Sequence, residues 1–236
     1  MNDEKTPATQ QAPPVVGGRF FFLFLFLLIQ LVLYPYAGEQ GVRYQWYRLL
    51  SFFITIASIY AVSFRRSTWI IALLFAIPVI WHRTILSEST ASKLALAGLM
   101  LGVAFDLLIV LVVFHRVFHT RDVTAQTIFG AVSIYLLVGF AFTRIYMFLV
   151  ALQPGAFYLD PILNRNAVPD HSALTFYSFG VMTSLGAAGI SPVTGQARSL
   201  TIIEAILGIL YLGVLVSRLI AMYRPAETSL AQQKQE

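Results

Sequence analysis

Runs of apolar residues that are long enough to cross a lipid bilayer recur along this 236-residue chain. A helix of about 20 mostly apolar residues spans the hydrocarbon core of a membrane. Only 11% of the residues are charged, against about 25% in soluble domains, so the surface of this chain cannot face water everywhere. This pattern excludes an ordinary cytosolic enzyme, a disordered regulator and a nucleic-acid-binding protein, and it predicts an all-α membrane protein.

Six apolar segments have the length expected of membrane-spanning helices, although the third is short and contains Pro78. The predicted spans cover residues 20–36, 47–64, 67–86, 94–118, 123–152 and 198–223. Basic residues are slightly more numerous on the side of the N-terminus, most clearly in the short loops at 65–66 and 116–121. Because cytoplasmic loops are enriched in Lys and Arg, we expect a multi-pass protein with both termini in the cytoplasm.

The two ends of the chain are polar. Residues 1–18 are rich in Pro, Gln and Gly and predict a disordered tail, and residues 225–236 form a second tail too short for a ligand-binding domain. The chain has no cysteine, which excludes disulfides and thiolate metal sites. We therefore expect no cofactor, and no metal other than a permeating cation.

One further apolar segment, residues 171–185, is too short to span a membrane. Asp170 can cap its start, and the glycine-containing stretch 186–189 should end it. Apolar segments of this length are more often re-entrant or buried than spanning. Irregular backbone at membrane depth is tolerated where it lines a cavity, as in an ion-selectivity filter. A simple extracellular turn between two spans is the alternative interpretation.

The residues of this region resemble the potassium channel superfamily. The segment TFYSFGVMTSLGAAGISP (175–192) is similar to the pattern YFSFxTxTTVGYGDIxP of the pore helix, filter and filter exit. The last span is similar to the inner helix of bacterial two-helix pore domains, at Ala197, Arg198, Ser199, Leu200, Glu204, Ala205, Gly208, Tyr211, Leu212, Val216, Ser217, Arg218 and Leu219. The resemblance implies a pore domain over 122–224 with outer helix, re-entrant pore helix, filter and inner helix.

The same resemblance implies a function. Filter carbonyls would replace the hydration shell of K⁺ or another monovalent cation, and one filter segment per chain implies a homotetramer. It also implies the plasma membrane of a bacterium, with membrane lipid as the other partner. The filter falls on Thr183, Ser184, Leu185, Gly186, Ala187, Ala188 and Gly189.

The centre of this candidate filter, residues 183–189, departs from the family pattern. Ser184 retains a hydroxyl and Gly186 retains the first glycine, but Ala188 replaces the second glycine. Ala187 replaces the aromatic residue, and Gly189 replaces the acidic residue at the pore mouth. The motif therefore indicates the pore architecture more firmly than potassium selectivity, and a weakly selective or non-conducting pore stays open.

Residues 19–121 match the sensor portion of six-helix channels only in the number of helices. They lack the repeated arginines that a voltage sensor needs, so we do not predict steep voltage gating. Asp106 lies within a span and either pairs with a basic residue such as Arg144 or makes another structural contact. His115 and His119 share a helix face and are most simply interfacial basic residues rather than metal ligands.

Four residues of the last span are candidates for supporting the pore. Glu204 either braces the filter, pairs with Arg198 or faces solvent, and both residues are filter-support candidates. Gly208 and Gly213 are candidates for an inner-helix hinge, and close helix packing is the equal alternative.

Other classes of function fit less well. An intramembrane enzyme would need a nucleophile beside a base, and the chain has neither a G-x-S-x-G motif nor a nucleotide-binding loop. A secondary transporter would need internal repeats, which are not evident. We expect no enzyme activity and no nucleic-acid partner, and a non-conducting regulatory subunit with the channel fold is the main alternative to a cation channel.

Overall fold

The computed structural model describes residues 18–35, 49–50, 53–60, 93–119, 124–164, 168–186 and 189–222. The predicted third span (67–86) and part of the second (47–48, 51–52 and 61–64) lie outside these residues. The same is true of Ala187 and Ala188, of the C-terminal tail, and of all but the last residue of the N-terminal tail.

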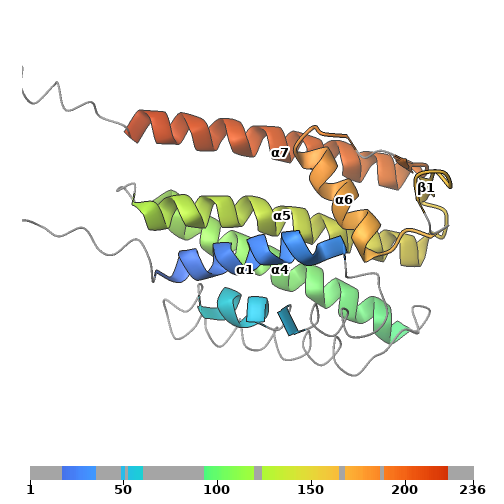
Figure 1. The fold of residues 1–236 in the computed structure, drawn as a ribbon, viewed down its shortest axis with the longest axis horizontal. Coiled ribbons are helices and arrows are strands. Elements are labelled where there is room, and N and C mark those ends of the chain that lie inside the picture. Colours follow the sequence, from blue (N-terminus) through green and yellow to red (C-terminus); the bar gives the residue numbers. More distant parts are fainter. Residues whose placement is uncertain are drawn as a thin grey trace, which may run out of the picture.

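The described residues are mostly helical. The elements are α1 (Arg19–Leu33), α4 (Lys93–His119), α5 (Ala125–Leu152), β1 (Phe157–Leu159), α6 (His171–Met182), β2 (Ile190–Pro192) and α7 (Gly195–Met222). Residues 53–60 are helical as well. Figure 1 shows the long helices lying side by side, with α6 slanting from the β1 end of the bundle towards the middle of α7.

Three of the described helices are long and apolar enough to cross a membrane, at Leu96–His119, Ala125–Leu152 and Gly195–Ser217. The membrane-compatible, helical character predicted from the apolar runs is thus confirmed. The helix α1 is apolar but only 15 residues long. The predicted total of six spans cannot be counted on the described residues, because the third lies outside them and the second is described only in part.

Polar caps fix where α5 and α6 begin. The hydroxyl of Thr124 accepts a hydrogen bond from the backbone N–H of Thr127. The carboxylate of Asp170 accepts one from Ala173 N–H at 2.7 Å, as expected from its position after Pro169. The helix α6 ends at Met182, earlier than the apolar segment does, because Ser184 adopts a φ of 58° that no right-handed helix can continue through.

The helix α5 lies at the centre of the fold and contacts α1, α4, α6 and α7. Its N-terminal half packs against α1 and α4 through aliphatic and aromatic side chains, among them Leu27, Ile109, Val113 and Ile134. Its C-terminal half packs against α6 and the loop that follows α5. There Tyr146, Phe157 and Tyr177 form a ring of edge-to-face contacts with centroids 5.1–5.3 Å apart. Each half of the helix therefore belongs to a different core cluster.

Strands β1 and β2 pair antiparallel, with Phe157 opposite Pro192 and Leu159 opposite Ile190. The strand β1 follows α5, whereas β2 follows the candidate filter. The pairing therefore returns the chain, after α6, to the end of the bundle from which α6 began (Figure 1).

The helix α7 is the least covered of the long helices. Only 11% of its most apolar stretch is buried, against 56% for α5. Its exposed apolar side chains include Ile202, Ile203, Ile206, Ile209, Leu210 and Val214. Within the described part of the chain, this face stays open.

Candidate functional site

Two glycines allow α6 to approach its neighbours closely. A Cβ built on Gly139 of α5 would lie 2.6 Å from the ring of Phe179, and one on Gly208 of α7 would lie 2.7 Å from the carbonyl oxygen of Met182. The end of α6 therefore presses directly on the backbone of α7. Gly208, predicted as a hinge or as a packing residue, is placed at this contact, whereas Gly213 has open space around it. The helix α7 continues through both glycines.

The C-terminal end of α6 is capped from α5. The hydroxyl of Tyr135 donates to the carbonyl oxygen of Met182 at 3.1 Å. Thr183 returns both its N–H and its hydroxyl to the carbonyl of Phe179. The last carbonyls of a helix carry a partial negative charge, so this end of α6 favours a cation.

Residues 183–186 leave α6 as an exposed, irregular segment. Ser184 has a φ of 58° and Gly186 a φ of 86°, whereas Leu185 between them does not have a positive φ. Ser184 is the single non-glycine residue with positive φ among the residues described. The N–H of Gly186 donates back to Gly180 at 3.1 Å, which ties the segment to the helix. Such conformations cost free energy and occur preferentially at functional sites.

The outer end of the candidate filter is tied to the loop between α5 and α6. The carbonyl of Gly189 accepts hydrogen bonds from Asp160 N–H at 2.7 Å and from Asn164 Nδ2 at 3.0 Å. Gly189 has a φ of 78°, and a Cβ there would lie 2.9 Å from Asn164 Nδ2 and 3.0 Å from Leu163 Cβ. A side chain at Gly189 would therefore displace part of this loop.

A buried carboxyl group joins the three helices around the pore segment. Glu204 of α7 is fully buried, and its two oxygens lie 2.5 Å from the hydroxyls of Tyr146 on α5 and Ser178 on α6. The Ser178 hydroxyl also lies 2.8 Å from the carbonyl of Gly139. Nearby, the hydroxyls of Tyr177 and Thr201 are 2.7 Å apart, which adds a second polar link between α6 and α7.

The support candidates thus separate in the structure. Glu204 contacts the body of α6 through Ser178 rather than the residues of the candidate filter. The guanidinium of Arg198 donates to the carbonyl of Pro192, at the end of β2, and not to Glu204. Of the two, Glu204 is the one that contacts α6.

Three contributors were not found from the sequence. Tyr146 lies 58 positions from Glu204, Tyr135 lies 47 positions from Met182, and Asn164 lies 25 positions from Gly189. Their residue types were the available signal, since a tyrosine in a span usually has a hydrogen-bond partner. No spacing rule links residues this far apart in the sequence.

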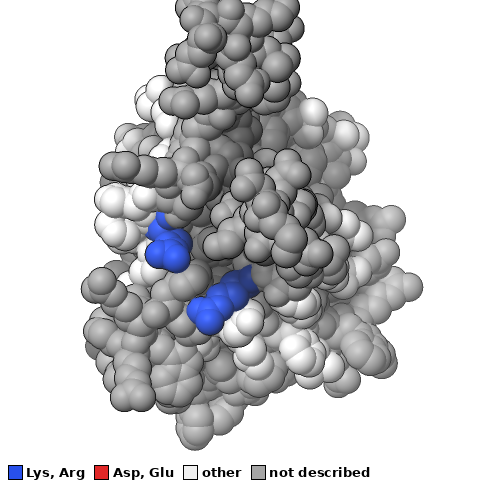
Figure 2. Space-filling model, turned by 90° about the vertical axis from the view of Figure 1, so that its left-hand side faces the viewer, with Lys and Arg blue, Asp and Glu red and all other residues white. Residues whose placement is uncertain are grey.

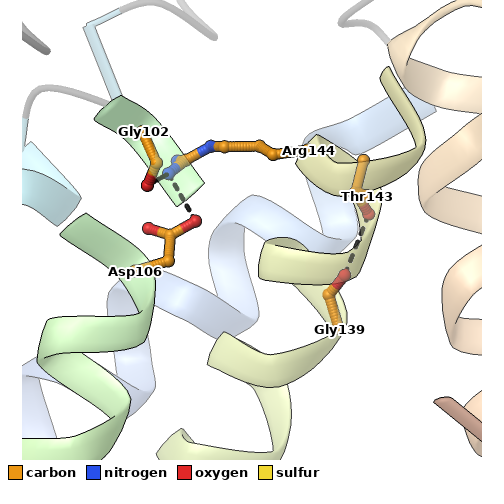
Figure 3. Close-up of polar contacts among 5 residues, drawn as sticks. All are labelled: Gly102, Asp106, Gly139, Thr143 and Arg144. Atoms are coloured by element: carbon orange, nitrogen blue, oxygen red, sulfur yellow. Dashed lines mark hydrogen bonds and ion pairs between the residues drawn. The ribbon is translucent and has the colours of Figure 1, made fainter. Parts of the chain in front are cut away.

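On the other side of α5, Asp106 and Arg144 form the ion pair anticipated from their positions in two spans. One guanidinium nitrogen of Arg144 contacts both Asp106 Oδ2 and the carbonyl oxygen of Gly102, the latter at 3.0 Å. Figure 3 shows Arg144 reaching across to α4, while the neighbouring Thr143 bonds back to Gly139 on its own helix. The side chain of Arg144 is 15% exposed and that of Asp106 is 7% exposed, and their contact links α4 to α5.

The end of the bundle away from β1 and β2, where α1 begins and α4 ends, carries basic side chains. Arg19 begins α1 and lies over the ring of Tyr60, and Arg116 and His119 lie in the last turn of α4. Figure 2 shows basic and no acidic side chains among the residues described on this end. His115 and His119 stack at 3.9 Å, and no group of three metal-ligating side chains occurs within the described part of the chain.

No family model matches this chain, and neither a curated protein nor a solved structure matches it. The likeness to the potassium channel superfamily therefore depends on the motif residues of the sequence and on the geometry around α6.

Proposed function

We propose that this chain is one subunit of a tetrameric, potassium-channel-like pore that conducts monovalent cations passively across a membrane. In this proposal the protein has six spans, α5 and α7 are the outer and inner helices of the pore domain, and α6 is a re-entrant pore helix. The observation that carries the proposal is the exposed segment 183–186, which follows the negative end of α6, where that helix is pressed against the middle of α7.

The backbone of this segment suits cation coordination. Ser184 and Gly186 have positive φ, so this backbone is neither helix nor strand, and in the proposal its carbonyl oxygens face the pore axis. Four copies around an axis would then present rings of carbonyl oxygens, which can replace the hydration shell of an ion. The Ser184 hydroxyl would add a ligand at the inner end.

The exposed face of α7 supports assembly. An inner helix of a four-chain pore contacts neighbouring subunits, which would cover part of the apolar face that a single chain leaves open. The basic side chains at the start of α1 and the end of α4 favour a cytoplasmic location for that end. The two-stranded sheet of β1 and β2 and the filter exit would then face the outside of the cell.

A regulatory subunit that keeps the channel fold without conducting is the second candidate. It is favoured by the crowded position of Gly189, where no acidic side chain can attract cations to the mouth.

Reconstituted flux tests the proposal. Purified protein in liposomes is expected to release K⁺ along its gradient, and the Gly186→Ala variant is expected to lose this flux. Gly155→Ala is the matched control, because Gly155 has nearly the same φ (88° against 86°) and equally open surroundings but lies in the loop after α5. Equal loss of flux in both variants would contradict the filter role of Gly186. Wild-type protein that carries neither K⁺ nor Na⁺ would favour the non-conducting subunit.

A further inference from the structure

We infer that Asn164 is a positioning residue, which sets the outer end of the candidate filter through its side-chain amide. The inference rests on the proposed function and deepens it, because it names how this pore is stabilised where the family pattern has an acidic side chain. Asn164 belongs to the loop between α5 and α6 and lies outside the pore motif.

The amide of Asn164 bridges two backbone carbonyls. Its Nδ2 donates to Gly189 O at 3.0 Å and to Asp160 O at 3.1 Å. An amide nitrogen has two protons, so both bonds form at once, and two acceptors fix which end of the amide faces the filter. Asn164 thereby joins the loop to the last residue of the candidate filter.

The loop that carries Asn164 is itself well fixed. The carboxylate of Asp160 accepts a bond from Ile162 N–H at 2.8 Å, and Asn164 N–H donates to Asp160 O at 2.9 Å. Directly before this turn, Leu159 pairs with Ile190 in the two-stranded sheet. The amide therefore projects from a short turn that is hydrogen-bonded internally and follows a paired strand.

Steric evidence points to the same role. The amide occupies the space that a side chain at Gly189 would need, 2.9 Å from the position of its Cβ. Gly189 O has two donors from the loop, while its φ of 78° commits the residue to a conformation that favours glycine. The loop and the glycine are thus complementary, and removal of the amide frees the filter exit from one of its two donors.

The test compares Asn164→Asp, Asn164→Ala and the control Ile162→Ala in the full-length protein in lipid nanodiscs and liposomes. Asn164→Asp is nearly isosteric but turns an acceptor towards two carbonyl oxygens, so its effect should exceed that of Asn164→Ala. Ile162 lies in the same loop, and its side chain is 90% exposed.

Two measurements are made. Backbone hydrogen exchange in peptides covering 156–164 and 183–192 should become about three- to tenfold faster in Asn164→Asp, as expected for loss of one hydrogen bond. The K⁺-to-Na⁺ permeability ratio, measured on equal amounts of assembled protein, should change several-fold in the same variant. Ile162→Ala should leave both measurements unchanged.

The outcomes separate the inference from the proposed function. Unchanged exchange in both Asn164 variants overturns the inference. Faster exchange with an unchanged permeability ratio also overturns it, since Asn164 would then support only the loop. Faster exchange in an Asn164 variant, when the wild-type protein carries no flux, supports Asn164 as the structural clamp and contradicts the channel function instead.

Discussion

A few buried polar side chains link α6 to the two long helices beside it. Glu204, Tyr146 and Ser178 meet at 2.5 Å in a fully buried cluster, and each comes from a different helix. Buried polar groups are tolerated when all are hydrogen-bonded, and removal of one leaves the others unsatisfied. Single substitutions at these positions therefore report on the link between α5, α6 and α7.

Glu204→Ala is expected to destabilise the protein by about 3 kcal/mol, because it removes one hydrogen bond from each of two buried hydroxyls and creates a cavity. Glu204→Gln keeps the size and one acceptor oxygen, and its NH2 can donate to the other hydroxyl oxygen, so it should cost clearly less. Ile203→Ala, at a half-exposed neighbouring position, is the control. Detergent-induced unfolding followed by circular dichroism measures the differences. Equal losses in the two Glu204 variants would contradict a role for its hydrogen bonds.

The ion pair of Asp106 and Arg144 predicts that single variants lose stability and that the double variant regains it. Removal of one partner, in Asp106→Leu or Arg144→Met, leaves a poorly solvated charge and should cost about 3–5 kcal/mol. The double variant removes both charges and should recover most of that loss. A double-mutant cycle of unfolding free energies measures the coupling. Additive losses would show that the pair contributes nothing as a pair.

At the scale of elements, the placement of α6 depends on glycine. The helix α6 passes from the end of the bundle that holds β1 and β2 to the middle of α7, where Met182 contacts Gly208. The side of α6 contacts α5 at Gly139. Its end is fixed by Tyr135 and its beginning by Asp170. A short helix held at both ends in this way keeps the segment after it in one place.

Two glycines of α7 should respond oppositely to alanine. Gly208→Ala places a Cβ 2.7 Å from the Met182 carbonyl oxygen, so it should separate α6 from α7 and lower both stability and flux. Gly213→Ala meets nothing within 4 Å and should stabilise the helix by up to about 1 kcal/mol. Unfolding and liposome flux of the two variants provide the comparison. If Gly213→Ala abolishes flux while it stabilises the fold, Gly213 is the hinge.

The sequence predicted elements better than contacts. Helices α4, α5, α6 and α7 lie close to the predicted segments, because long apolar runs and a capping Asp170 are local signals. The Asp106–Arg144 pair was one of the alternatives that the sequence left open for Asp106, because opposite charges in apolar spans can satisfy each other. The contact of Asn164 with Gly189 was not predictable, because it depends on how the loop between α5 and α6 folds back. No local pattern of residue types indicates such a contact.

At the scale of the whole molecule, the uncovered face of α7 and the exposed segment 183–186 both belong to the proposed pore domain. Both are apolar or irregular surfaces that a single chain leaves open. In a tetramer with a central axis, both would be enclosed by the other subunits.

The absence of cysteine makes this arrangement measurable. Leu185→Cys introduces a unique thiol in the candidate filter, and four such thiols near an axis should cross-link between chains under mild oxidation. Leu111→Cys is the control, since Leu111 of α4 is comparably exposed (65% against 76%) but lies away from α6. Denaturing gels should show dimers for the first variant alone. Cross-linking through Leu111 but not Leu185 would contradict a central filter.

The bridge from Arg144 to the carbonyl of Gly102 and the carboxylate of Asp106 also has a mechanical consequence. It fastens α4 to α5 by side chain and backbone together, so a displacement of α4 pulls on α5 and, through Tyr135, on the end of α6. In the proposed channel, this bridge and the apolar contacts between the two helices would together carry a displacement of α4, such as one caused by thinning or stretching of the bilayer, to the segment after α6.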